Sequence, residues 1–99
     1  MKLKSNIEIE DINRLSEIAE VYEITKQSEK SARYHKNIIK LCDKFPKNEK
    51  ILQYKMKSLN CLNKPYKSLE TTDELLSLNP NNMEALFNIA RHMKEALDV

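Results

Sequence analysis

The sequence predicts an all-α protein, and three observations support this prediction. Apolar residues recur at spacings of three and four along most of the chain, as on one face of a helix. The alternation that indicates a strand occurs only briefly, in NIEIE near the N-terminus. Polar or proline-containing segments, among them those around Pro46 and Pro80, interrupt the helical pattern. We therefore expect five helices joined by short connections, with neighbouring helices antiparallel.

The first two expected helices lie before the first proline. Asp11 is the expected N-cap of the first helix, and Ser28 or Ser31 of the second, because short polar side chains accept the first backbone amides. Pro46 ends the second helix, since proline has no amide proton and clashes with the preceding turn. The first apolar stripe contains Ile12, Leu15, Ile18, Ala19, Val21, Tyr22 and Ile24, and the second contains Ala32, Tyr34, Ile38, Leu41, Cys42 and Phe45.

Three further helices follow. Asn48 is the expected cap of the third helix, and Asn63 tolerates the left-handed conformation of the next turn better than most residues. Pro65 suits the first position of the fourth helix, and Asn81 or Asn82 is expected to cap the fifth. Their stripes are Leu52, Met56, Leu59 and Leu62; Tyr66, Leu69, Thr72, Leu75, Leu76 and Leu78; and Leu86, Ile89, Ala90, Met93 and Leu97.

The spacing from Pro46 to Pro80 divides the chain into helix-turn-helix units at 15–48 and 49–82, followed by a half unit at 83–99. This 34-residue period resembles the tetratricopeptide repeat, and LNPNNMEALFNIA is the most similar stretch. The resemblance implies a single domain over residues 1–99 in which antiparallel helix pairs stack as a short right-handed superhelix. Residues 1–14 would be an N-terminal extension and the start of the first helix. The alternative is an irregular helical bundle in which the proline spacing is coincidental.

Length and composition exclude several classes of protein. The 99 residues suit one small domain, and 17 basic against 15 acidic residues give a net charge of +2, too little for a nucleic-acid-binding surface. No apolar run is long enough to span a membrane, and the N-terminus lacks the apolar core of a signal peptide. Cys42 and Cys61 are therefore expected to be reduced, buried thiols of a cytoplasmic protein.

The sequence offers no pattern of catalytic or metal-binding residues. Without glycine there is no phosphate-binding loop, and neither Cys-x-x-Cys nor His-x-x-x-His occurs. His35, between basic neighbours in RYHKN, is expected to be exposed, and His92 lies near the end of a helix. We therefore expect no enzyme, no catalytic residue, no metal and no cofactor.

The tetratricopeptide resemblance implies a concave groove lined by the first helix of each unit. It places Ser16, Ala19, Glu20 and Glu23 there, with pairs expected between Lys50 and Glu84 and between Glu23 and Lys57. Lys57 and Arg91 would then be adjacent like charges, which an acidic peptide or protein segment could neutralise. The expected peptide-binding residues are Gln53, Tyr54, Lys57, Asn60, Phe87, Asn88, Arg91 and Lys94.

The leading functional prediction is thus a non-catalytic protein–protein interaction module. The alternatives are a structural scaffold that forms a homodimer through exposed helix ends, a segment of a longer repeat protein, and an RNA-binding array, against which the near-neutral charge argues. Ile7 and Ile9 are expected to cover the N-terminal end of the stack. The fifth helix is expected to cap the other end with a polar outer face made of Glu84, Asn88, Arg91, Glu95 and Asp98.

Overall fold

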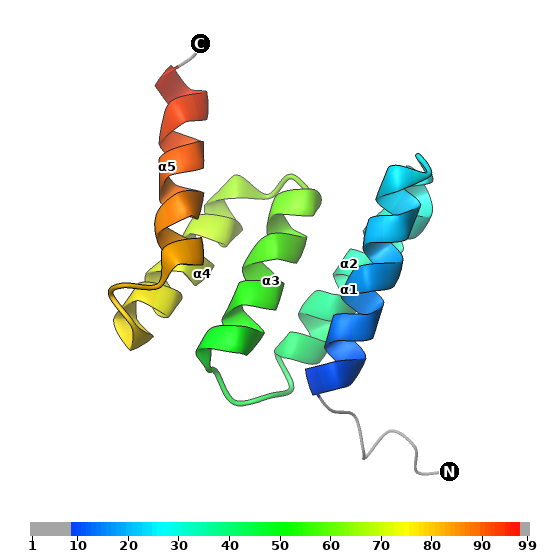
Figure 1. The fold of residues 1–99 in the computed structure, drawn as a ribbon, viewed down its shortest axis with the longest axis horizontal. Helices are drawn as coiled ribbons and strands as arrows, with labels where there is room; N and C mark the ends of the chain where they lie inside the picture. The colour runs from blue at the N-terminus through cyan, green and yellow to red at the C-terminus, as the bar shows by residue number, and fades with distance from the viewer. Residues whose placement is uncertain (1–8, 98–99) are drawn as a thin grey trace.

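The computed structural model describes residues 9–97, and these residues form five α-helices without a strand. The α1 and α2 helices pack against each other, as do α3 and α4; α3 also contacts α2, and α5 contacts α4 (Figure 1). The described part of the chain therefore has the all-α fold that the sequence predicts. The helices are α1 (Ile9–Ile24), α2 (Ser28–Cys42), α3 (Glu49–Cys61), α4 (Pro65–Leu78) and α5 (Met83–Leu97).

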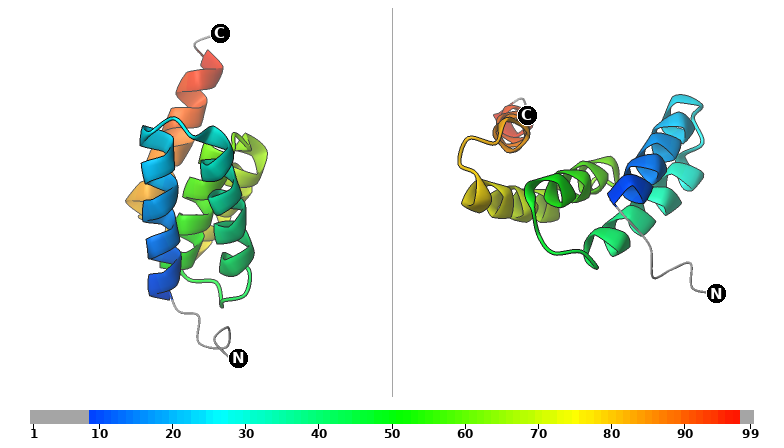
Figure 2. Two further views of the ribbon diagram at one scale, coloured as in Figure 1. Left: turned by 90° about the vertical axis from the view of Figure 1, so that its right-hand side faces the viewer. Right: turned by 60° about the horizontal axis from the view of Figure 1, so that its bottom comes forward.

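The stack of helices is elongated and thin, with principal extents of 50 × 34 × 17 Å. In Figure 1, α3 lies between α1 and α5. In the right-hand view of Figure 2 the helices follow a curve, with α5 at one end and the α1–α2 pair at the other. None of the helices in residues 9–97 is long and apolar enough to cross a membrane.

Asparagine side chains cap the starts of α3 and α5, as predicted. The Oδ1 atom of Asn48 accepts a hydrogen bond from the backbone amide of Ile51 at 2.9 Å, and Asn82 caps Ala85 in the same way at 2.9 Å. Each bond satisfies one of the amides that the first turn of a helix leaves without a partner. Pro65 is the first residue of α4, where its missing amide proton has no cost.

The expected caps of the first two helices are wrong. Because α1 is already helical at Ile9, Asp11 lies within its first turn rather than before it. Residue Gln27 precedes α2 and its side chain makes no capping hydrogen bond, while Ser28 is already helical. Ser31, the other candidate, is buried.

The turns inside the two helix pairs have the same geometry. In each, a residue with positive φ follows the helix: Lys26 at 62° and Asn63 at 59°. The next amide bonds back five residues, from Gln27 to Tyr22 at 2.8 Å in one turn and from Lys64 to Leu59 at 2.9 Å in the other. This is the Schellman motif, which satisfies carbonyl groups at the end of a helix. Asn63 is the left-handed residue that the sequence predicts, whereas nothing in the sequence predicts this conformation for Lys26.

The first helix pair departs from the period of the prolines. The caps Asn48 and Asn82 are separated by the same number of residues as the two prolines. The turn residues Lys26 and Asn63 are separated by three residues more than that. The difference arises because the α2–α3 connection, residues 43–48, is longer than the α4–α5 connection, residues 79–82, and α2 is one residue longer than α4. Ile18, Val21 and Ile24, which the sequence places in the core, are exposed.

Most of the buried apolar residues form two clusters that meet at α3. Ile51 belongs to one cluster and its neighbour Leu52 to the other, so α3 joins the first helix pair to the second. Ile9 packs against the first cluster, as expected, whereas Ile7 lies outside the described residues. The first cluster is Ile12, Ala19, Ile38, Cys42 and Ile51; the second is Leu52, Met56, Leu75 and Ala85.

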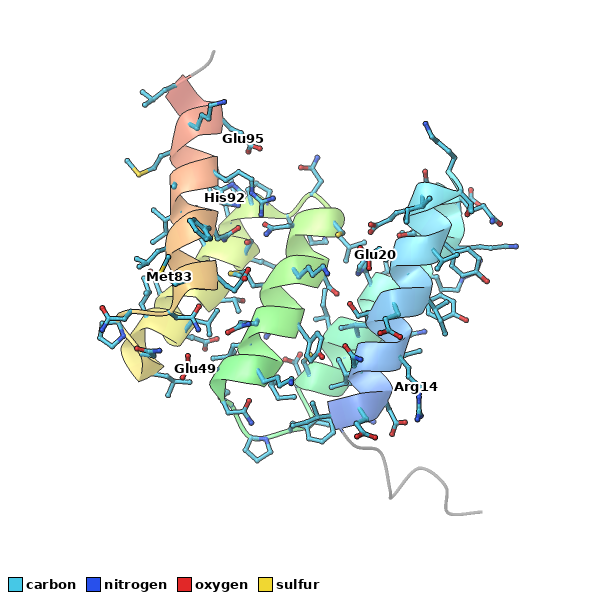
Figure 3. All side chains as sticks on the ribbon, viewed as in Figure 1. Arg14, Glu20, Glu49, Met83, His92 and Glu95 are labelled. Carbon is cyan, nitrogen blue, oxygen red and sulfur yellow. The ribbon has the colours of Figure 1, made fainter. Side chains whose placement is uncertain are left out.

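The outer face of α5 differs from the polar cap that the sequence predicts. Asn88 is buried, and Asp98 lies outside the described residues. Four large apolar side chains of α5 are exposed along a helical stripe, and Met83, at the start of the helix, is labelled in Figure 3. The four are Met83, Leu86, Met93 and Leu97.

Candidate functional site

A cavity of about 660 Å³ lies between α3 and α5. It brings together seven of the eight residues that are expected to bind a peptide; Lys94 does not line it. The lining residues are Lys50, Gln53, Tyr54, Met56, Lys57 and Asn60 from α3, and Glu84, Phe87, Asn88 and Arg91 from α5.

Polar contacts at the start of α3 hold one end of this cavity. The amide nitrogen of Asn82 donates to Oε1 of Glu49 at 2.7 Å and to Oε1 of Gln53 at 2.9 Å, and Asn79 donates to Glu49 at 3.1 Å (Figure 3 labels Glu49). Hydrogen bonds from Asn82 and Asn79 lower the pKa of the Glu49 carboxyl. These bonds fix the start of α5 against α3.

The other end is held by a network around Asn88, which is only 2% exposed. Its amide nitrogen donates to Ser68 at 3.0 Å and to Thr72 at 2.9 Å, both on α4. Its oxygen accepts from Asn60 at 2.8 Å and from Arg91 at 3.1 Å. Both amide hydrogens are thus used inside the protein, so Asn88 joins α3, α4 and α5 rather than offering the hydrogen bond to a ligand that the sequence suggested.

The groups left for a ligand are two lysines and an aromatic ring. Lys50 and Lys57 make no hydrogen bond or ion pair with the described residues, and the expected pair between Lys50 and Glu84 does not form. Phe87 is 62% exposed. With Arg91, the cavity has three cationic side chains against the single carboxylate of Glu84, which favours an acidic ligand.

Three other groove positions have contacts or burial that the resemblance did not suggest. The hydroxyl of Tyr54 donates to Asn13 of α1 at 2.8 Å, so the ring lies in the cavity wall and also links α3 to α1. Ser16 and Ala19, which the resemblance places on the groove, are buried instead. Their burial follows from the shift of the first helix pair.

A second cavity, of about 480 Å³, is lined by residues of α2, α3 and α4. Its charges nearly balance: it contains four lysines and three carboxylates, and Lys55 donates to Asp43 at 2.8 Å. This cavity is therefore a weaker candidate for a charged ligand, and its lysines provide a control for the first cavity.

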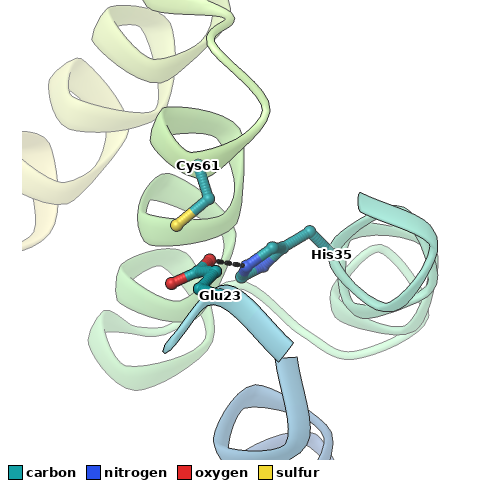
Figure 4. Close-up of side chains that lie close together, drawn as sticks. All are labelled: Glu23, His35 and Cys61. Atoms are coloured by element: carbon teal, nitrogen blue, oxygen red, sulfur yellow. Dashed lines mark hydrogen bonds and ion pairs between the residues drawn. The ribbon is translucent and has the colours of Figure 1, made fainter. Parts of the chain in front are cut away.

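Glu23, His35 and Cys61 form a polar cluster at the junction of α1, α2 and α3 (Figure 4). The Nε2 atom of His35 lies 2.6 Å from Oε2 of Glu23, and its Nδ1 atom lies 2.9 Å from the hydroxyl of Ser58. Ser31 also donates to Glu23 Oε2, at 3.3 Å. His35 is 2% exposed, so the predicted surface position is wrong, and Glu23 forms no ion pair with Lys57.

The environment of this cluster shifts the pKa values of Glu23 and Cys61. Burial opposes ionisation of Glu23, but hydrogen bonds from His35, Cys61 and Ser31 outweigh it and lower the pKa of the carboxyl below its usual 4.5. Desolvation and the hydrogen bond to Glu23 raise the pKa of Cys61 to about 12, although the residue is exposed rather than buried as expected. Cys42 is buried, as predicted, and burial raises the pKa of its thiol to about 12.

The cluster has no signal in the sequence. Its members lie far apart in the chain, on three different helices, and their spacings match no short metal-binding motif. Only the packing of α1 and α2 against α3 brings the carboxylate, imidazole and thiol within 4.8 Å of one another. These are the described residues that could hold a metal ion.

Comparisons with protein-family models, with curated proteins and with solved structures find no match to this chain. The residues of the two sites are therefore the basis for any functional assignment.

Proposed function

We propose that this chain is a non-catalytic helical-repeat module, of tetratricopeptide type, that binds an acidic protein segment between α3 and α5. The main support is that Lys50 and Lys57 have no ion-pair partner among the described residues. Both line the same cavity as the exposed ring of Phe87. An acidic segment with an apolar side chain would pair with the lysines and cover the ring. The starts of α3 at Glu49 and of α5 at Met83 repeat the spacing of the two prolines, which supports the repeat assignment.

The cavity has the properties that such a ligand requires. Hydrogen bonds at both ends hold α3 and α5 in place before a ligand arrives, through Asn82 at one end and Asn88 at the other. A preformed site loses less conformational entropy on binding than one that must be ordered. The excess of positive charge accelerates association with an acidic segment and makes the affinity dependent on ionic strength.

Binding is tested by titrating the protein into a short fluorescent peptide of alternating glutamate and leucine and measuring anisotropy. The double variant Lys50→Glu/Lys57→Glu reverses two charges that form no hydrogen bond or ion pair with the described residues. We expect it to raise the dissociation constant at least about tenfold, because each paired charge contributes roughly a kcal/mol or more when partly shielded from water. A peptide of alternating glutamine and leucine should bind weakly to both proteins.

The matched control is Lys36→Glu/Lys67→Glu, which makes the same change in net charge at the second cavity. Both lysines are exposed and form no ion pair with the described residues. This control should bind the acidic peptide as the wild type does. Equal weakening in both double variants would mean that only the total charge matters, and the α3–α5 cavity would then not be the binding site.

A second candidate function, self-association, is favoured by the exposed apolar stripe of α5. Met83, Leu86, Ala90, Met93 and Leu97 alternate at spacings of three and four, the pattern that packs one helix against another, and all five are exposed. The proposed occupant is α5 of a second copy of this chain. In this role the protein would be a structural scaffold.

Sedimentation velocity over a range of concentrations distinguishes the two functions. A self-associating wild type should form dimers that Leu86→Glu/Met93→Glu abolishes, because two charged residues would be buried in the new contact. A wild type that stays monomeric at the highest concentration would exclude this candidate and leave the peptide-binding function as proposed.

A further inference from the structure

We propose that Glu23, His35 and Cys61 form a metal site for Zn²⁺, with water as the fourth ligand. The proposed site shares no residue with the lining of the α3–α5 cavity, although Lys57 and Arg91 of that cavity act on Cys61 through their charge. It would join α1, α2 and α3 through one ion (Figure 4). The combination of thiolate, imidazole and carboxylate suits Zn²⁺, which accepts sulfur, nitrogen and oxygen ligands in one tetrahedral site.

The distances allow an ion with little movement. The three ligand atoms lie within 4.8 Å of one another, and around a tetrahedral Zn²⁺ such atoms are roughly 3.3–3.6 Å apart. The hydrogen bond of 2.6 Å between His35 and Glu23 is shorter than this, and the ion would lengthen it by about 0.7–1 Å as it replaces the shared proton. The side chain of Glu23 is 39% exposed and can make this adjustment, whereas His35 is held in place by burial.

Contacts beyond the three ligands orient them for binding. A metal-binding imidazole usually uses its second nitrogen to donate a hydrogen bond, which fixes the ring and its tautomer. Nδ1 of His35 lies 2.9 Å from the Ser58 hydroxyl, which can accept that bond, and Nε2 points toward Glu23 and Cys61. Ser31 donates to the Glu23 carboxylate and limits its orientation. The arrangement around His35 is thus that of a metal ligand with its supporting partner.

An ion can reach the site from solvent. A small cavity of about 250 Å³ is lined by Glu23, Cys61, Ser28, Ser31 and Ala32, and it leaves room for the fourth, water ligand. Lys57 and Arg91 are the cations close enough to Cys61 to affect its protonation. They oppose a bound cation but stabilise the thiolate that the cation requires.

Binding must release a proton. Zn²⁺ binds the thiolate form of cysteine, so the proton of the Cys61 thiol leaves as the Zn–S bond forms. If His35 starts as the neutral Nε2–H tautomer, its proton moves to Nδ1 and is donated to Ser58, so the imidazole contributes no net release. The apparent association constant should therefore increase as the pH rises.

Cobalt(II), which occupies zinc sites and absorbs visible light, provides the test. Wild type with reduced thiols should bind a single Co²⁺ per chain and show both a thiolate-to-cobalt charge-transfer band and the intense visible bands of tetrahedral cobalt. Cys61→Ala should lose the charge-transfer band. Cys42→Ala removes the other thiol of the chain, which lies in the core, and should keep the band.

Zn²⁺ titration by calorimetry tests the carboxylate while the buried imidazole itself is retained. Glu23→Gln should weaken binding at least about tenfold, and Glu20→Gln, on the same helix, should not. Absence of the charge-transfer band from the wild type, or its persistence in Cys61→Ala, would overturn the proposal. Equal Zn²⁺ affinity in Glu23→Gln and the wild type would also overturn it.

Discussion

The Nε2 atom of His35 lies 2.6 Å from Oε2 of Glu23, which places a buried imidazole against the carboxylate of another helix. Ser58, on the other side of the ring, connects the pair to α3. Three helices that are separated by turns in the sequence thus meet at one side chain. The consequence for stability can be measured apart from any metal, in the presence of a chelator.

Glu23→Gln should remove part of the pH dependence of stability. The pKa of Glu23 is lower in the folded protein than its usual 4.5, so ionised Glu23 stabilises the fold above that pH. This contribution is lost as the pH falls below 4.5 and through the lowered pKa. Denaturant unfolding at several pH values should therefore show a shallower acid limb for the variant. Glu20→Gln should retain the wild-type slope, and parallel curves for wild type and Glu23→Gln would contradict the prediction.

Asn88→Ala should destabilise the protein by about 1–3 kcal/mol, the usual cost of leaving buried polar partners unsatisfied. The change removes the acceptor for Asn60 and the donor for Ser68 and Thr72. Urea unfolding measures the loss, with the exposed Asn37→Ala as a control expected within about 0.5 kcal/mol of wild type. Equal stabilities for the two variants would show that the network has no net effect.

Lys26→Gly should stabilise the protein by about 0.5–1 kcal/mol, since the turn requires a left-handed residue. Lys26 has φ of 62°, a conformation that costs an L-residue roughly 1–2 kcal/mol, and the greater freedom of glycine in the unfolded chain offsets part of the gain. Lys26→Ala, which removes the same side chain but keeps the unfavourable conformation, should give no such gain in the melting temperature. A similar rise in both variants would assign the effect to the lysine side chain instead.

Leu75→Ala should cost about 2–5 kcal/mol, because the fully buried side chain leaves a cavity in the second core cluster. Leu78, on the same helix, is 52% exposed, and Leu78→Ala should cost about 1 kcal/mol at most. The free energy of unfolding in guanidinium chloride gives both values. A loss for Leu78→Ala as large as that for Leu75→Ala would contradict the assignment of the core.

The parts of the fold that are predictable from the sequence depend on neighbours in the chain. Asn48 caps a residue three positions away, Pro65 occupies the first position of its own helix, and Asn63 adopts its own left-handed conformation. Each preference acts within one turn of helix, so the residue type alone reveals it. Lys26 shows the limit: its turn is the same as that of Asn63, but a lysine gives no local signal for positive φ.

The site is predictable in part for a similar reason. Seven of the eight residues predicted to bind a peptide lie together between α3 and α5, because this pair keeps the period of the prolines, from Asn48 to Asn82. Their hydrogen-bond partners could not be predicted, since the amide of Asn88 donates to Ser68 and Thr72 of α4. Which polar groups remain for a ligand depends on these contacts between helices.

Periodicity, proline and capping residues are sufficient to specify five helices and their approximate ends, because the interactions involved act between residues within one turn of helix. Which residues of two helices face each other is a different matter, because this register also depends on the lengths of the connections between the helices. The longer segment between α2 and α3 shifts the first pair relative to the second. That shift places Glu23 beside His35 and Cys61 instead of in an ion pair with Lys57. Only the packing of the helices in three dimensions determines this arrangement.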